Sequence, residues 1–164
     1  MVGQKMPQLA SVGNGIWVGN FHACGLKPFR TVHIWHEKQN GVCEFVQKGD
    51  VGHQELNYQN VQHLVINYLE GSEVPVLEME RIWYWVQMSP ADIFVHCAAG
   101  MARSTCFCVI AKVVRGCDRY QALADIAKGV WEQYEIKVSP HFHTHIMTPI
   151  FRWLDTKLKN ESHT

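Results

Sequence analysis

The sequence predicts a single α/β domain with a short central sheet. Its 164 residues, 47% of them apolar, match the size of one domain with one core. Short segments rich in β-branched and aromatic residues come first and alternate with a helical pattern, whereas helical patterns fill the second half. No internal repeat, low-complexity stretch or block of charge interrupts the chain. We therefore expect one domain over residues 1–164, with an ordered core over about residues 10–158.

Four strands are predicted. Residues 15–19 (GIWVG), 30–35 (RTVHIW) and 62–68 (QHLVINY) are short and rich in β-branched and aromatic side chains. Residues 39–60 are largely polar and contain glycine, so they are predicted to be a loop with at most one short strand or helix. Residues 91–96 (ADIFVH) are predicted to be a buried strand.

Four helices are predicted from apolar residues at helical spacing. The first covers residues 78–87 and ends before Ser89-Pro90, and the second follows Arg103 and ends at Gly116. Two more follow, the last with Thr148 as its N-cap and Pro149 as its first residue. The apolar faces of the four helices are, in order, Met79, Ile82, Trp83 and Val86; Cys106, Val109, Ile110 and Val113; Leu123, Ala127 and Val130; and Ile150, Trp153, Leu154 and Leu158.

The charge balance excludes one class of function. The chain has 15 Lys and Arg against 15 Asp and Glu, whereas proteins that bind nucleic acid through bulk electrostatics carry an excess of positive charge. No apolar run approaches the roughly 20 residues needed to span a bilayer. The first ten residues, MVGQKMPQLA, lack the apolar core of a signal peptide. We therefore expect a cytoplasmic monomer that acts without nucleic acid or a membrane.

The cysteines and histidines do not predict a metal centre. The six cysteines are scattered, so we expect reduced thiols, and the pair Cys106 and Cys108 would point in different directions on a helix. His141 and His145 would share a helix face at a spacing that suits zinc. No carboxylate accompanies them, so we interpret them as structural or surface residues.

The chemically informative segment is residues 95–105 (VHCAAGMARST), in which a buried strand runs into a loop of small residues and then opens a helix. A helix N-terminus presents unpaired backbone amides and the positive end of the helix dipole, and small residues let those amides approach a phosphate. The predicted phosphate cradle consists of Ala98, Ala99, Gly100, Met101, Ala102 and Arg103.

Cys97 begins this loop and Arg103 ends it, with five residues between them. The amides that hold a phosphate would also stabilise a thiolate, which predicts that Cys97 is a nucleophile. The planar, permanently charged guanidinium of Arg103 can bind two phosphate oxygens and follow their charge into the transition state. The sequence therefore predicts a nucleophile, a cradle and a clamp within seven residues.

The run His96-Cys97-Ala98-Ala99-Gly100-Met101-Ala102-Arg103-Ser104 resembles the signature of the protein tyrosine phosphatase superfamily, which is His-Cys, five residues, Arg, then Ser or Thr. The segments GIWVGN, RTVHIW and HLVINYLEG, with the helix before the signature and the three helices after it, resemble a small dual-specificity phosphatase domain over about residues 10–158. The resemblance implies a central, mostly parallel short sheet flanked by helices.

The resemblance also implies a two-step hydrolysis without a metal or another cofactor. Cys97 would attack phosphorus to form a phosphocysteine while an acid protonates the leaving oxygen, and water would then hydrolyse the intermediate. Ser104 would donate to the departing sulfur. His96 would lie behind the loop, where its hydrogen bonds would hold the loop's shape and favour the thiolate.

The general acid departs from the family pattern, which uses an Asp some thirty residues before the cysteine. The chain has no Asp between Asp50 and Asp92. Glu70 lies 27 residues before Cys97 and five before Pro75, which resembles the family's spacing of acid, four residues and proline. Glu70 is therefore the predicted acid, Glu73 is the second candidate, and a chain without a working acid is the third alternative.

Two functions follow from these residues. The first is a phosphoprotein phosphatase that prefers phosphotyrosine to phosphoserine and phosphothreonine, because an aryl leaving group depends least on protonation. The loop has no Lys, which disfavours highly phosphorylated inositol lipids as substrates. The second is a noncatalytic phosphate-binding module, a pseudophosphatase, which retention of Cys97 and Arg103 disfavours and the missing Asp favours.

Overall fold

A six-stranded sheet runs through the centre of the computed structural model, which describes residues 6–35, 55–58, 61–69, 71–97, 102–137 and 143–161, with the backbone alone at residues 35 and 55–58. The strand order is β1-β2-β6-β3-β5-β4. The strands are β1 (Leu9–Ser11), β2 (Ile16–Asn20), β3 (Arg30–Trp35), β4 (Glu55–Tyr58), β5 (Val61–Asn67) and β6 (Ile93–Cys97). In the described part of the chain, four α-helices follow or separate them, namely α2 (Val76–Gln87), α3 (Ala102–Val114), α4 (Arg119–Tyr134) and α5 (Thr144–Glu161).

The sheet is parallel at its centre and antiparallel at both edges. β6 pairs in parallel with β2 and β3, and β3 pairs in parallel with β5. The edge strands β1 and β4 run antiparallel to β2 and β5. The predicted α/β class with a mostly parallel central sheet is therefore confirmed. Because the four inner strands are parallel, their carboxyl ends meet at one edge of the sheet, where ligands bind in open α/β sheets.

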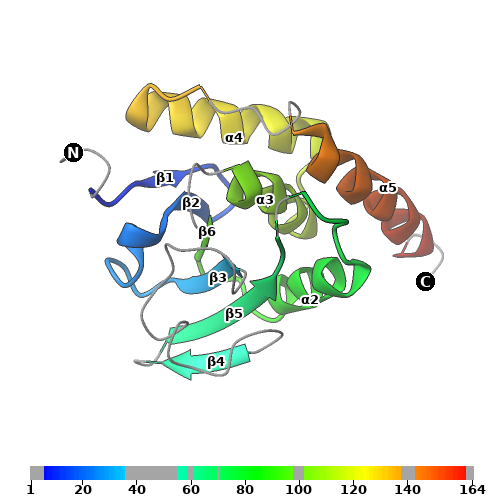
Figure 1. Cartoon of the computed structure of the whole chain (residues 1–164), viewed down its shortest axis with the longest axis horizontal. Coiled ribbons are helices and arrows are strands. Elements are labelled where there is room, and N and C mark those ends of the chain that lie inside the picture. The colour runs from blue at the N-terminus through cyan, green and yellow to red at the C-terminus, as the bar shows by residue number, and fades with distance from the viewer. Residues whose placement is uncertain are drawn as a thin grey trace.

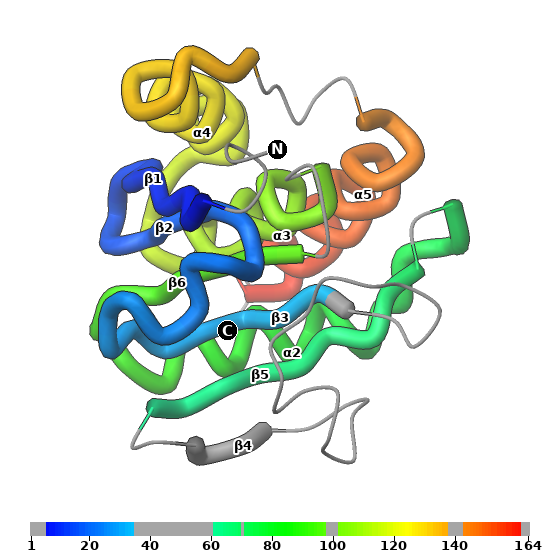
Figure 2. The backbone as a smooth tube through the Cα atoms, turned by 60° about the vertical axis from the view of Figure 1, so that its left-hand side comes forward, coloured from blue at the N-terminus to red at the C-terminus, as the bar shows by residue number. Residues whose placement is uncertain are grey.

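The helices are arranged around α3, which packs on β6 and β2 (Figures 1 and 2). Helix α2 lies against α3 and β5, α4 lies against α3 and β1, and α5 lies against α3. Every residue of α3 from Arg103 to Val113 is buried, so this is the central helix of the fold. Figure 1 shows α5 beside α2, and a hydrogen bond from Lys157 Nζ to Glu80 Oε2 at 3.0 Å joins these two helices.

Two glycines are required by close backbone approach. A Cβ at Gly19 would lie 1.7 Å from the carbonyl oxygen of Gln8, the residue before β1, and this carbonyl also accepts a hydrogen bond from the amide of Asn20 at 3.2 Å. A Cβ at Gly129 would lie 2.3 Å from the carbonyl oxygen of Ser11. Gly129 therefore lets α4 pack directly against the end of β1. Glycine has a low helix propensity, so this packing lowers the intrinsic stability of the helix at that position.

The start of the last helix differs from the prediction. Helix α5 begins at Thr144 rather than after Thr148, and Pro149 lies inside it. The carbonyl of His143 accepts hydrogen bonds from the amides of Ile146 and Met147 at 2.9 and 2.8 Å, which starts the helix one turn earlier. Both of these residues are buried, and their burial offsets the hydrogen bond that a proline forfeits in the second turn.

The other departures are short edge elements and single face residues. The sequence did not predict β1 or the 3-10 helix η2 (Phe21–Ala23), and β4 is the one short strand allowed within residues 39–60. Leu158 is 40% exposed rather than buried, and Ala127 is half-buried, since α4 buries Ala122 and Ile126 instead. Among the described residues, no helix combines the length and apolar character of a membrane span.

Candidate functional site

The central strand carries Cys97 to the edge of the sheet where the parallel strands end. Cys97 is the last residue of β6 and pairs with Asn20 of β2 on one side and Ile34 of β3 on the other. Helix α3 begins five residues later at Ala102, so Arg103 falls in its first turn. The predicted strand before this segment and the predicted helix after it are thus present. Four cradle residues, Ala98, Ala99, Gly100 and Met101, lie outside the described residues, and their role stays a prediction.

Cys97 and Ser104 are brought together, as the sequence predicts. The Cys97 Sγ and Ser104 Oγ atoms are 3.5 Å apart, which is within hydrogen-bonding distance for sulfur. Both residues are buried, with exposed fractions of 1% and 0%. In this position the Ser104 hydroxyl can donate a hydrogen bond to the Cys97 thiolate. This hydrogen bond can stabilise the sulfur both when it attacks phosphorus and when it departs.

Arg103 connects the first turn of α3 to the end of β5. Its guanidinium is 3% exposed, and Nη1 donates to the carbonyl of Tyr68 at 3.5 Å. Tyr68 is the first residue after β5 and lies two positions before Glu70. The arginine that is predicted to clamp phosphate therefore contacts the segment that leads into the predicted acid.

Glu70 itself lies outside the described residues, but the residues on either side of it are held in place. The Tyr68 hydroxyl donates to the carbonyl of Ser72 at 3.2 Å, and the Ser72 amide donates to the carbonyl of Leu69 at 3.1 Å. Glu73, the second candidate, is described and is exposed. The choice between these two carboxylates stays a prediction.

Glu78 is a buried carboxylate that the sequence analysis missed. It lies in the first turn of α2 with no exposed surface, and its Oε2 accepts a hydrogen bond from the amide of Asn67 at 3.2 Å. Asn67 and Tyr68 are consecutive, so Glu78 and Arg103 hold neighbouring backbone groups at the end of β5. The available signal was an acidic residue in the first turn of a helix, where the helix dipole favours a negative charge.

Three histidines form a chain on one face of the sheet, which we call the histidine cluster: His33 of β3, His63 of β5 and His96 of β6. His96 Nε2 is 2.5 Å from His33 Nδ1, and His33 Nε2 is 2.8 Å from His63 Nδ1. Because side chains alternate along a strand, His96 points to the opposite face of the sheet from Cys97. The cluster thus lies on the face of the sheet opposite Cys97. The loop that the resemblance places in front of His96 lies outside the described residues, so that role of His96 stays a prediction.

The buried histidines favour the neutral form. Burial lowers the pKa of His96 to about 4, although a hydrogen bond with the backbone of Cys97 acts in the opposite direction. Burial, with the nearby His96 and His63, holds the pKa of His33 well below its ordinary value. At neutral pH the strand that carries Cys97 is therefore supported by uncharged imidazoles.

Cys24 joins the cluster from the segment that follows η2. Its Sγ is 3.1 Å from His96 Nε2, and Cys24 is disulfide-bonded. The expectation that all cysteines are reduced is therefore wrong for Cys24, because the spacing of cysteines along a sequence does not show which of them form disulfides. The other described cysteines, which are not in disulfides, are Cys97, Cys106, Cys108 and Cys117.

The predicted histidine motif near the last helix is described in part. His141 lies outside the described residues, so its proposed pairing with His145 is not addressed. The rings of His143 and His145 lie 6.2 Å apart at the start of α5, and His145 is exposed. Nothing in the described residues assigns these side chains a catalytic role.

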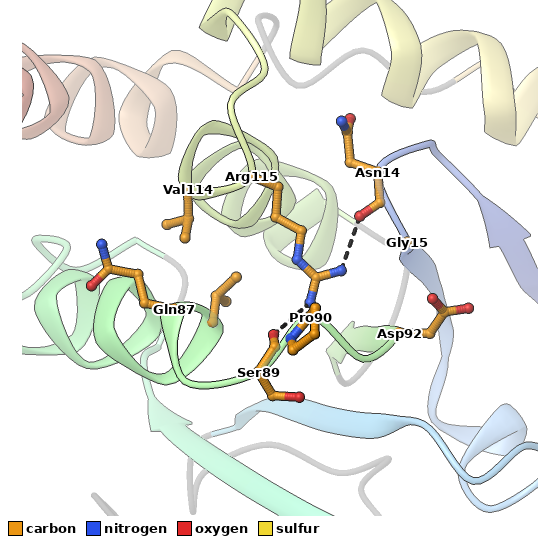
Figure 3. Close-up of a pocket in the computed structure, with 9 residues that line it drawn as sticks. Asn14, Gly15, Gln87, Ser89, Pro90, Asp92, Val114 and Arg115 are labelled. Carbon is orange, nitrogen blue, oxygen red and sulfur yellow. Dashed lines mark hydrogen bonds between the residues drawn. The ribbon is translucent and has the colours of Figure 1, made fainter.

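A separate cavity of about 640 Å³ lies at the other end of β6 (Figure 3). Arg115 extends into it, and its guanidinium donates to the carbonyls of Asn14, Ser89 and Ala91 at 3.0, 3.1 and 2.6 Å. These bonds tie the end of α3 to the loops before β2 and β6. Since the cavity borders Asp92 and β6 rises about 3.3 Å per residue, it lies about 16 Å from Cys97 and is distinct from the candidate site.

The comparisons with known proteins rest on structure, since no protein-family sequence model and no curated protein sequence matches the chain. A mouse putative dual specificity phosphatase, solved in complex with zinc tungstate, is similar with a TM-score of 0.66 and 14% identity over 95% of this chain and 92% of that one. Human DUSP28 is similar with a TM-score of 0.63 and 13% identity over 93% and 97% of the two chains.

A human tyrosine phosphatase-like serine/threonine/tyrosine-interacting protein is also similar, with a TM-score of 0.57 and 15% identity over 92% of this chain and 97% of that one. Each of these matches spans nearly all of both chains, so the likeness covers the whole domain. The agreement in structure extends the resemblance first seen in the signature around Cys97. The chain therefore has the fold of the small dual-specificity phosphatases.

Proposed function

We propose that the chain is a cysteine-dependent protein phosphatase that hydrolyses phosphotyrosine and, more slowly, phosphoserine and phosphothreonine. The observation that carries the proposal is the contact of 3.5 Å between Cys97 Sγ and Ser104 Oγ, at the carboxyl end of the central parallel strand. Arg103 lies next to Ser104 in the same helical turn. A nucleophile, a donor to its sulfur and a phosphate ligand therefore come from one strand-to-helix connection.

In the first step the Cys97 thiolate attacks phosphorus and the bond to the leaving oxygen breaks. Glu70, as the general acid, protonates that oxygen and releases the dephosphorylated hydroxyl group. Arg103 and the backbone amides at the start of α3 hold the phosphoryl oxygens during transfer. The product of this step is a phosphocysteine.

In the second step water attacks the phosphocysteine, and Glu70 now accepts the proton from that water. The sulfur–phosphorus bond breaks and inorganic phosphate leaves. Ser104 donates a hydrogen bond to the departing sulfur, which lowers the barrier for this step more than for the first. No metal takes part in either step.

The proposed substrate is a phosphorylated protein. A tyrosine leaving group depends less on protonation than the alkoxide of serine or threonine, so phosphotyrosine is the preferred substrate. We place the reaction in the cytoplasm, where the Cys97 thiol stays reduced, and propose that the chain acts as a monomer without nucleic acid or a membrane. The similarity in structure to a mouse putative dual specificity phosphatase and to human DUSP28 supports the assignment.

The test is hydrolysis of a phosphotyrosine peptide and of an activated aryl phosphate, with a reductant and a chelator present. Cys97→Ser should abolish turnover of both substrates while the phosphopeptide still binds. Glu70→Gln should slow peptide hydrolysis by about 100-fold or more and should slow the aryl phosphate much less, because general acid catalysis contributes about that factor. Cys117→Ser is the matched control, since this thiol is not in a disulfide and lies between α3 and α4, and it should retain full activity.

The outcomes also separate the rival function. One similar structure is titled a tyrosine phosphatase-like interacting protein, so a phosphate-binding module without catalysis is the second candidate. Phosphopeptide binding without turnover by the unmodified chain would support that module. Turnover by Cys97→Ser equal to that of the unmodified chain would refute cysteine catalysis, and loss of peptide turnover in Glu73→Gln but not in Glu70→Gln would transfer the acid role to Glu73.

A further inference from the structure

Among the described residues, one group of metal-ligating side chains lies outside the proposed catalytic site. The Sγ of Cys24 and the ring nitrogens of His33 and His96 all lie within 4.8 Å of one another. We propose that these three side chains bind a Zn²⁺ ion on the face of the sheet opposite Cys97. The proposal does not depend on phosphatase activity, because Cys97 is not a ligand.

The sheet itself brings the three ligands together. His33 and His96 are direct neighbours across the parallel pair of β3 and β6, so the backbone register places both rings at the same level on the same face. Cys24 follows η2, which begins directly after β2, and β2 is the other neighbour of β6. The ligands therefore come from three elements whose positions the sheet fixes, which is the preorganisation that a metal site needs.

The atoms converge correctly but lie slightly too close for an ion between them. His96 Nε2 is 3.1 Å from Cys24 Sγ and 2.5 Å from His33 Nδ1. Zinc binds nitrogen at about 2.0 Å and sulfur at about 2.3 Å, so neighbouring ligands in a tetrahedral site lie about 3.3 to 3.7 Å apart. Separating these atoms by less than about 1 Å would admit the ion, and rotation of the side chains can supply that movement.

The surroundings suit zinc. Two imidazoles and one thiolate are a ligand set of the kind zinc takes, and the fourth position would remain open for water. Both imidazoles are buried, with no exposed surface. His33 uses its Nδ1 toward the site, and its Nε2 contacts His63 Nδ1 at 2.8 Å. Such an outer partner fixes the tautomer and orientation of a metal-binding histidine, so His63 is the expected positioning residue.

The oxidation state of Cys24 controls the site. The structure has Cys24 in a disulfide, and a disulfide sulfur is a poor ligand compared with a thiolate. A thiol reductant transfers two electrons to the disulfide, giving two protein thiols and the oxidised reductant. Zinc then displaces the proton of the Cys24 thiol, which passes to solvent. We therefore expect zinc to bind the reduced chain and to be released when the disulfide forms.

The experiment is a zinc titration of Cys97→Ser, in which the nucleophilic thiol cannot contribute a ligand. The protein is reduced with a phosphine, and a chromophoric chelator competes for Zn²⁺. We expect one ion per chain. Adding Cys24→Ser should weaken binding by at least about 100-fold, and adding His63→Gln should weaken it by about 10-fold to 100-fold. Adding Cys117→Ser, the matched thiol control, should leave the affinity unchanged.

A second measurement needs no further substitution. Co²⁺ added to reduced Cys97→Ser should give a thiolate-to-cobalt charge-transfer band, and that band should be absent in the oxidised protein and in the variant that also carries Cys24→Ser. Circular dichroism in the presence of chelator checks that each variant folds. Failure of the reduced chain to bind zinc, or a cobalt band that survives Cys24→Ser, would overturn the site. Loss of phosphatase activity would leave the proposal untouched, since binding is measured without the nucleophile.

Discussion

The burial of His96 predicts a specific loss of stability in acid. In the folded chain its pKa is lowered to about 4 from the ordinary value of 6.5, because a charged imidazole cannot be solvated beneath the sheet. The unfolded chain therefore binds a proton more readily than the folded chain between these two values. The stabilising contribution is complete above about pH 6.5 and is lost as the pH falls through about 4.

The magnitude follows from the difference between these two pKa values. At about 1.4 kcal/mol for each factor of ten, the complete loss is about 3 kcal/mol, and most of it occurs between about pH 7.5 and pH 4.5. The lowered pKa of His33 acts in the same direction. Against a typical domain stability of about 5 to 15 kcal/mol, this effect is large enough to measure.

Urea unfolding across this pH range, with chelator present, is the assay. The fall in the free energy of unfolding between about pH 7.5 and pH 4.5 should be smaller in His96→Gln than in the unmodified chain by about 2 to 3 kcal/mol. His145→Gln is the matched control, because this ring is exposed at the start of α5, and it should follow the unmodified chain. An equal fall in His96→Gln and the unmodified chain would refute the assignment of acid sensitivity to this buried ring.

Three further predictions concern single contacts. Ser104→Ala should slow hydrolysis of the phosphocysteine by about 100-fold and should have little effect on its formation. Rapid-quench experiments should therefore show a burst of released leaving group. A linear time course would contradict this role of Ser104. Gly129→Ala should destabilise the fold by about 1 to 3 kcal/mol in urea unfolding, because its Cβ would meet the Ser11 carbonyl; greater stability, as helix propensity alone predicts, would count against the close approach. Asp125→Asn should lower the free energy of unfolding by about 1 kcal/mol, because it removes the carboxylate that lies 3.2 Å from the buried Lys112 Nζ. An unchanged urea midpoint would show that this ion pair does not contribute to stability.

The sequence predicts the elements whose signals are local. The strand at residues 30–35 is found as predicted, and α2 buries every residue of its predicted face. The signature is also local, since a buried strand, small residues and a helix start follow one another within about a dozen residues. Its described parts fold as predicted, with Cys97 at the end of a strand and Arg103 in the first turn of a helix.

The elements that the sequence missed have weak local signals. β1 has three residues, which is too short for alternation to stand out, and it is defined by pairing with β2. The start of α5 was placed too late because Pro149 was interpreted as a first helical residue, which is its commonest helical position. Tertiary burial of Ile146 and Met147 overrode that preference.

The support behind the nucleophile could not be predicted, because it depends on strand order. His96 is adjacent to Cys97 in the sequence, yet its partners His33 and Cys24 are 63 and 72 residues away. Alternation along a strand tells which residues share a face, but not which strands are neighbours. The last strand in the sequence, β6, enters the sheet between β2 and β3, and this insertion alone places His96 opposite His33 and beside the segment after β2. If β6 lay at an edge of the sheet, the residues of the signature would still follow one another, but His96 would no longer lie beside His33. The histidine cluster therefore depends on the strand order, whereas the signature depends only on consecutive residues.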